Sequence, residues 1–280
     1  MVNIHGRFVW YELVTTEIEA AKAFYSKVMG WAPLDASVPG RAYTLFAVGN
    51  VLVGGLMGLP EDAREAGAKP NWLGYVGVDD VDAAADRIKH LGGTVLVPPT
   101  EVPSVSRFSI FADPQSAKLA LLKWQGLGLA RAAELDGLGR VGWHELLAAD
   151  WEQALAFYSE LFGWRRADAH TGEMGTYQVF SDGVQPIGGM LTKPPQVADP
   201  FWLYYFNVAS LDAAAQRVKA GGGQIIDGPF EVPGGTCVLR CADPQGAMFA
   251  LEGQLRRRAV GYFERVGGGP SDPRGRRWSW

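Results

Sequence analysis

The segment Val9-Trp10-Tyr11-Glu12-Leu13 recurs later in the chain as Gly142-Trp143-His144-Glu145-Leu146. Both copies continue with Ala-Phe-Tyr and then Gly-Trp, and Trp10, Tyr25 and Trp31 each have a counterpart 133 residues further on. An internal repeat that keeps its register in this way predicts two homologous domains, one after the other. A period of this length is typical of paired domains rather than of a solenoid, whose repeats are much shorter.

The downstream part of each copy extends the repeat and sets the domain boundaries. Trp72, Pro103 and the turn Asp113-Pro114-Gln115 have counterparts 130 residues later, so we expect only the loop between Gly55 and Trp72 to differ in length. The resulting boundaries are a first domain at residues 1–124, a linker at 125–139, a second domain at 140–253 and a basic tail at 254–280.

Each half shows the same order of predicted elements. In the first half, residues 8–15 alternate like a strand, and apolar residues then recur at helical spacing over 18–28 until Gly30 ends the helix. A second helix is predicted at residues 81–91, before Gly92-Gly93. The remaining strands are predicted at 43–48, 51–57, 73–78, 94–97, 106–111 and 117–123. Each half therefore contains two strand-helix-strands units, and the chain contains four.

The composition is that of an ordinary globular protein and excludes several classes. The 280 residues are 48% hydrophobic and 20% charged, which argues against wholesale disorder. No apolar run approaches the roughly 18 residues of a membrane span, and the first residues do not resemble a secretory signal, so we expect a cytoplasmic protein with no membrane partner. Residues 253–280 carry a local charge of +5 and the rest of the chain −9, and this acidic body argues against nucleic acid as a partner. We expect a monomer or a homodimer.

The order of motifs carries a resemblance to a known family. A strand, a Phe-Tyr helix, Gly-Trp, a second strand ending in Val-Asp, Gly-Gly and a final Asp-Pro-Gln hairpin resemble the vicinal oxygen chelate superfamily, which includes glyoxalase I, extradiol dioxygenases and bleomycin-binding proteins. The resemblance covers residues 7–124 and 140–253 and is greatest to a two-domain bacterial glyoxalase-like group. It implies an α+β fold of two tandem domains, each a pair of βαβββ modules forming curved mixed sheets with helices outside.

The same resemblance identifies the positions at which metalloenzymes of this superfamily hold a divalent ion. These lie on the first strand, on the strand before the second helix and on the last strand of each half. In this sequence they are occupied by Trp10, Leu73 and Ala120, and by Trp143, Leu203 and Ala250. None of these side chains is a suitable ligand for a hard or borderline cation. We therefore expect no metal and no other cofactor.

His144 is the histidine nearest to a ligand position, since it follows Trp143 directly. A shift of one residue along a strand reverses the face to which the side chain points. We therefore expect His144 to be a packed or interface histidine, although a shifted register would bring it into the site.

Glu12 and Glu145 lie two residues beyond Trp10 and Trp143, and therefore on the same face of their strands. We call this concave face of each sheet the cup. A carboxylate on an otherwise apolar strand is costly to bury unless it is paired or protonated. Each Glu is thus either a general base or hydrogen-bond acceptor for a ligand, or a structural group paired with an arginine such as Arg107 or Arg240.

The same alternation assigns further residues to the two cups. The first cup is predicted to contain Trp10, Glu12, Leu73, Tyr75, Ala120 and Leu122, and the second Trp143, Glu145, Leu203, Tyr205, Ala250 and Glu252, with Asn207 deeper along its strand. Aromatic walls with one or two polar groups are typical of a site for a flat, partly apolar ligand. Because Glu252 corresponds to Leu122, the second cup is predicted to be the more polar and the more reactive one.

Three functions remain open on the sequence alone. The first is a binding protein that holds a small aromatic or hydrophobic molecule without a metal, with Trp10, Glu12, Tyr75, Trp143, Tyr205 and Asn207 as ligand-binding residues. The second is an enzyme of lyase, isomerase or dioxygenase type that transfers protons through Glu145 and Glu252. The third is a metalloenzyme whose ligands occupy a shifted site.

Overall fold

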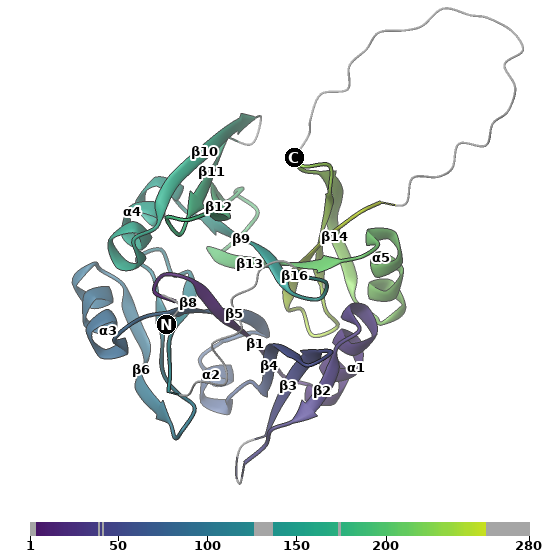
Figure 1. Cartoon of the computed structure of the whole chain (residues 1–280), viewed down its shortest axis with the longest axis horizontal. Coiled ribbons are helices and arrows are strands. Elements are labelled where there is room, and N and C mark those ends of the chain that lie inside the picture. The colour runs from purple at the N-terminus through teal and green to yellow at the C-terminus, as the bar shows by residue number, and fades with distance from the viewer. Residues whose placement is uncertain (1–3, 39, 41, 126–136, 173–174, 256–280) are drawn as a thin grey trace, which may run out of the picture.

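The protein consists of two halves of matching architecture packed side by side (Figure 1). The computed structural model describes residues 4–38, 40, 42–125, 137–172 and 175–255. Most of the predicted linker at 125–139 and of the predicted tail at 254–280 lies outside these residues. No helix in the described part of the chain is long and apolar enough to cross a membrane.

The first half forms one eight-stranded mixed sheet. Its elements are β1 (Phe8–Thr15), α1 (Ile18–Met29), β2 (Ala32–Asp35), β3 (Tyr43–Val48), β4 (Val51–Gly58), α2 (Glu61–Glu65), β5 (Asn71–Gly77), α3 (Val81–His90), β6 (Thr94–Val102), β7 (Ser106–Ala112) and β8 (Lys118–Trp124). The strand order is β2-β3-β4-β1-β5-β8-β7-β6. The first strands of the two modules, β1 and β5, pair antiparallel at the centre of the sheet, and each runs parallel to the last strand of its own module.

The second half repeats this arrangement. Its elements are β9 (Val141–Ala148), α4 (Trp151–Phe162), β10 (Arg165–Gly172), β11 (Gly175–Ser181), β12 (Pro186–Thr192), β13 (Phe201–Val208), α5 (Leu211–Ala220), β14 (Gln224–Glu231), β15 (Cys237–Ala242) and β16 (Met248–Gly253). The strand order is β10-β11-β12-β9-β13-β16-β15-β14, which matches that of the first sheet. This agreement confirms the predicted α+β fold of two tandem domains, each built from two βαβββ modules.

The ends of the first helix of each half follow from local residues. Gly30 after α1 and Gly163 after α4 both have a φ of 75°, in the left-handed region that glycine adopts without steric cost. At the other end of α4, the Asp150 carboxylate accepts the backbone N–H groups of Glu152 and Gln153, whereas Glu17 before α1 makes no such side-chain bond. The two helices therefore share the same glycine cap at their C-termini but differ in the capping of their N-termini.

Three features of the fold differ from the expectation or were missed by it. Strands β2 and β10 were not predicted, because they are exposed throughout and lack apolar alternation. The short helix α2 lies in the loop that varies between the halves. The expectation that only the loop between Gly55 and Trp72 changes length is wrong. Gly55 pairs with Glu12 and Gly189 pairs with Glu145, and these two glycines are 134 residues apart, whereas the earlier residues of the repeat are 133 apart. The second half is therefore already one residue longer before this strand.

The main hydrophobic core lies between the two halves and contains residues from both. The helices meet across it, with α1 beside α5 and α3 beside α4 (Figure 1). The Tyr25 hydroxyl donates to the Asp243 carboxylate at 3.1 Å, and its counterpart Tyr158 donates to Asp113 at 3.0 Å. Burial raises the pKa of both carboxyl groups. The repeated tyrosines Tyr25 and Tyr158 therefore hold the two halves together and lie outside the cups.

Candidate functional site

The predicted alternation along the central strands is present in the first half. Five of the six residues assigned to the first cup form one buried cluster, separate from the core between the halves: Trp10, Leu73, Tyr75, Ala120 and Leu122. The sixth, Glu12, lines the same cavity as Trp10 and Tyr75. Strand register explains this grouping, since Trp10 lies opposite Tyr75 and Tyr75 lies beside Ala120.

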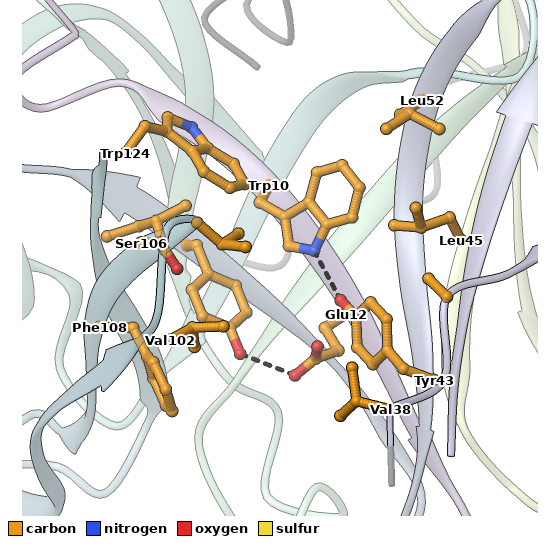
Figure 2. Close-up of a pocket in the computed structure, with 14 residues that line it drawn as sticks. Trp10, Glu12, Val38, Tyr43, Leu45, Leu52, Val102, Ser106, Phe108 and Trp124 are labelled. Atoms are coloured by element: carbon orange, nitrogen blue, oxygen red, sulfur yellow. Dashed lines mark hydrogen bonds between the residues drawn. The ribbon is translucent and has the colours of Figure 1, made fainter. Parts of the chain in front are cut away.

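The first cup contains a cavity of about 320 Å³. Figure 2 shows its walls: β1 supplies the centre, the β2–β4 side supplies one wall and the β6–β8 side the other. The lining residues are Trp10, Glu12, Ala36, Val38, Tyr43, Leu45, Leu52, Tyr75, Val102, Val105, Ser106, Phe108, Leu122 and Trp124. Trp10 and Trp124 meet edge to face, with ring centroids 6.0 Å apart. Most of the wall is therefore aromatic or aliphatic, and Glu12 is the one carboxylate among these fourteen residues.

Two hydrogen bonds orient the polar groups of this cavity (Figure 2). The Tyr75 hydroxyl donates to Oε2 of Glu12 at 2.7 Å, and the Trp10 indole Nε1 donates to the Tyr43 hydroxyl at 3.3 Å. Glu12 is buried, with 6% of its surface exposed. Gly55 makes room for Tyr43, because a Cβ at this position would overlap the tyrosine ring. The cavity thus presents a carboxylate and a tyrosine hydroxyl that are held in place before any ligand arrives.

The second cup repeats the aromatic part of this arrangement. Leu203, Tyr205 and Ala250 belong to one buried cluster, against which Trp143 and Tyr177 pack. The Trp143 indole Nε1 donates to the Tyr177 hydroxyl at 2.7 Å, as Trp10 does to Tyr43. Trp143, Leu203, Tyr205 and Ala250 thus lie together as the alternation predicts, with Tyr177 in addition.

The carboxylate of the second cup has a different partner. Arg240 in β15 donates from its terminal guanidinium nitrogen to Oε1 of Glu145 at 2.7 Å, and from Nε to the Tyr205 hydroxyl at 3.4 Å. Burial raises the pKa of the Tyr205 hydroxyl well above its usual range, so it stays protonated. The pairing of Glu145 with Arg240 matches the structural alternative considered above. Arg107 instead pairs with Asp82, outside the first cup.

Glu252 and Asn207 lie away from Glu145. Asn207 is opposite Glu252 in the parallel pair of β13 and β16, whereas Glu145 is opposite Leu203, four residues earlier in β13. Four residues of a strand span about 13 Å. Glu252 accepts the Thr236 hydroxyl at 2.8 Å. The structure thus does not bring Glu145 and Glu252 together as the acid and base of one reaction.

The positions that the resemblance assigned to metal ligands lie in the cups. Glu12 and Leu73 are opposite one another, as are Trp10 and Tyr75, and Ala120 lies beside Tyr75. Within the described residues, no group of three His, Cys, Asp or Glu side chains is arranged to hold a metal ion. The indole and alkyl groups at these positions do not fit a divalent ion, which requires oxygen, nitrogen or thiolate donors.

His144 lies in the core between the halves, on the face of β9 opposite to the cup, as the alternation predicts. Its ring is fully buried and stacks on Phe8, with centroids 3.7 Å apart. Its Nε2 is 2.6 Å from the hydroxyl of Tyr11, its counterpart in the repeat, and its Nδ1 is 2.5 Å from the Ile187 carbonyl. Burial lowers the pKa of His144 to about 3, so the ring is neutral at ordinary pH.

Sequence reasoning missed several residues of the first cavity. Trp124 lies two residues beyond Leu122, so the alternation already applied to this strand would have found it. Tyr43 could have been found because Tyr177 repeats it, although at an offset of 134. Val38 and Val105 lie outside the long strands and are exposed, and no periodic pattern places such residues.

The amino-acid sequence is similar to those of several known proteins. The chain is 33% identical to CFP32 of Mycobacterium bovis, a protein provisionally named as a glyoxylase, over 244 residues that cover 86% of this chain and 92% of that one. It is 31% identical to the anthracycline biosynthesis protein DnrV of Streptomyces peucetius, over 88% of this chain and 92% of that one.

Solved structures share the fold at lower sequence identity. The Mn(II)-bound glyoxalase of Novosphingobium aromaticivorans is 18% identical and superposes with a TM-score of 0.62 over 91% of this chain and 84% of that one. The family model described as the glyoxalase/bleomycin resistance protein/dioxygenase superfamily matches residues 7–121 and again residues 138–251. The chain therefore belongs to the glyoxalase/bleomycin resistance protein/dioxygenase superfamily, as a glyoxalase-like protein with two tandem domains.

Proposed function

We propose that the first cup binds a flat, largely apolar ring system, and that it does so without a metal ion. The observation that carries this proposal is the cavity of about 320 Å³, which has aromatic walls and the Glu12 carboxylate held by Tyr75. Ligand pockets range from about 300 to 1,000 Å³, so this cavity suits a compact molecule of a few fused rings. The sequence alone favoured the second cup as the more reactive one, whereas we propose the first cup as the ligand site.

The interactions available in the cavity support moderate affinity. A ring packed against Trp10, Phe108 or Trp124 gains about 0.5–1.5 kcal/mol per aromatic pair beyond the burial of apolar area. A hydrogen bond from a phenolic hydroxyl of the ligand to the Glu12 carboxylate contributes about 1.5–3 kcal/mol. After the cost of immobilising the ligand, these terms are consistent with a dissociation constant in the micromolar range.

The names of two relatives support the chemical class of the ligand. DauV and DnrV, at 30% and 31% identity over 88% of this chain, are named for anthracycline biosynthesis. Anthracyclines contain a planar ring system that carries phenol and quinone oxygens. A polycyclic phenol or quinone of this general type is therefore the ligand class that we propose.

Proton transfer on the bound molecule is a second candidate function. It is favoured by the burial of Glu12 in an apolar cavity, because a carboxylate there is suited to accept a proton from an acidic group of the ligand, and the 2.7 Å hydrogen bond from the Tyr75 hydroxyl orients this carboxylate. In this proposal Glu12 takes the role that the sequence alone suggested for Glu145 and Glu252. Exchange of a carbon-bound ligand proton with deuterium in heavy water, lost in Glu12→Gln, would support it.

Equilibrium dialysis with 1,4-dihydroxyanthraquinone tests the binding proposal. Trp10→Ala and Glu12→Gln are each expected to weaken binding of this probe by about tenfold or more, which is a loss of about 1.4 kcal/mol. Trp143→Ala and Glu145→Gln are the matched substitutions in the second cup and are expected to have little effect. If only the second pair weakens binding, the ligand lies in the second cup; if neither pair does, the binding proposal fails.

A further inference from the structure

Ile110 in β7 and Arg240 in β15 occupy matching places in the two sheets. Ile110 lies opposite Ala120 and Arg240 lies opposite Ala250 in the antiparallel pairs of their halves. Ala120 and Ala250 in turn lie beside Tyr75 and Tyr205. Ile110 packs against the cluster of the first cup, so both side chains extend over the same face of their sheets. At this position the first cup therefore has an alkyl group and the second cup a guanidinium.

Arg240 engages the two polar groups whose counterparts line the cavity of the first cup. It donates to Glu145 at 2.7 Å and to the Tyr205 hydroxyl at 3.4 Å, and it lies 3.9 Å from the Asp227 carboxylate. Glu145 and Glu12 are buried to a similar extent, at 4% and 6% exposed, so the two carboxylates differ in their partners and not in their burial. A charge-assisted bond of this kind is about twice as strong as a neutral one, so a neutral ligand does not readily displace the arginine.

The loop that differs in length between the halves adds to this difference. In the second half, Val197 packs against the cluster of the second cup. Its loop is held by a hydrogen bond from the Lys193 ammonium group to the Val197 carbonyl at 2.6 Å. In the first half the corresponding loop contains α2, none of whose residues is buried. The shorter loop therefore contributes an apolar side chain to the second cup, whereas the longer loop stays outside.

We propose that the residue at this position of β7 and β15 determines which cup accepts a ligand. Ile110 leaves the first cup open, whereas Arg240, together with Val197, fills the second cup with the protein's own side chains. The chain then carries one ligand site, in its first half, and its second cup is a structural copy. This inference rests on the proposed binding function and adds to it a specificity-determining position.

The substitution Ile110→Arg tests the inference in the full chain. The matching register should let the new guanidinium reach Glu12 as Arg240 reaches Glu145, so the affinity for 1,4-dihydroxyanthraquinone should fall at least tenfold. Ile110→Met supplies a long side chain without the charge and should bind within about threefold of the parent. Equilibrium dialysis of the parent should give one probe molecule per chain.

A reciprocal variant covers the case in which Ile110→Arg does not fold. Arg240→Met removes the guanidinium from the second cup and should leave the affinity of the first cup unchanged. Two probe molecules per parent chain, or unchanged affinity in folded Ile110→Arg, would each overturn the inference and leave binding in the first cup standing. An affinity loss in Arg240→Met would place the ligand in the second cup and overturn both. If the parent binds no probe at all, the proposed function fails and this inference fails with it.

Discussion

Replacement of Gly55 by alanine isolates the contribution of Tyr43 to the first cup. Gly55 lies on β4 beside Glu12, and a Cβ there would be 2.7 Å from Cζ of Tyr43 and closer still to its hydroxyl oxygen. Its φ lies outside the left-handed region, so alanine can adopt this backbone and only the space is at issue. The tyrosine ring must therefore move, and the hydrogen bond from Trp10 to Tyr43 is lost.

The expected size of the effect follows from two known costs. Overfilling a packed site costs about 1–3 kcal/mol, and the lost hydrogen bond contributes about 0.5–1.5 kcal/mol. Because the Tyr43 ring is a wall of the cavity, we expect a similar loss of binding free energy. A loss of 1–3 kcal/mol corresponds to a dissociation constant that is roughly 5- to 150-fold higher.

Gly189→Ala is the matched control in the second cup. Gly189 lies beside Glu145, and a Cβ there would overlap the ring of Tyr177 in the same way. We therefore expect both variants to lose a similar free energy of unfolding in urea, while only Gly55→Ala binds 1,4-dihydroxyanthraquinone more weakly in equilibrium dialysis. Equal affinity losses in the two variants, or unchanged affinity in a destabilised Gly55→Ala, would refute the reasoning.

Three further outcomes are expected. Because burial holds the pKa of His144 at about 3, against 6.5 for an ordinary histidine, the unfolded chain takes up the extra proton below pH 6.5. This histidine should then lower the free energy of unfolding by up to about 1.4 kcal/mol per pH unit as the pH falls from 6.5 towards 3. In urea titrations at several pH values, His144→Phe should remove this pH dependence of the free energy of unfolding, and His170→Gln should retain it. Ser116 has a φ of 78° where the repeat has Gly246, so Ser116→Gly should stabilise the protein by about 0.5–1 kcal/mol in thermal unfolding, and an unchanged or lower melting temperature would contradict this. Dialysis against EDTA should leave the affinity for 1,4-dihydroxyanthraquinone unchanged, and a loss restored by added Zn²⁺ or Mn²⁺ would disprove metal-independent binding.

Much of the fold and part of the site follow from the sequence, because they depend on local periodicity. The repeat predicts two like domains, and alternation along a strand is enough to place Trp10, Glu12 and Tyr75 on one face and His144 on the other. A side chain's face depends only on its position in its own strand. The same reasoning could not predict β2 or β10, whose exposed residues carry no periodic signal.

The tertiary structure alone decides what the repeated residues do and which cup is open. Tyr25 bonds to Asp243 of the other half, a contact between residues 218 apart that no local pattern encodes. Glu12 and Glu145 are equivalent in the sequence, yet Glu145 lies within reach of Arg240 from a strand three positions away in the sheet. The occupancy of a cup depends on side chains that distant strands and loops bring together, and their distances are set by the packing of the whole sheet.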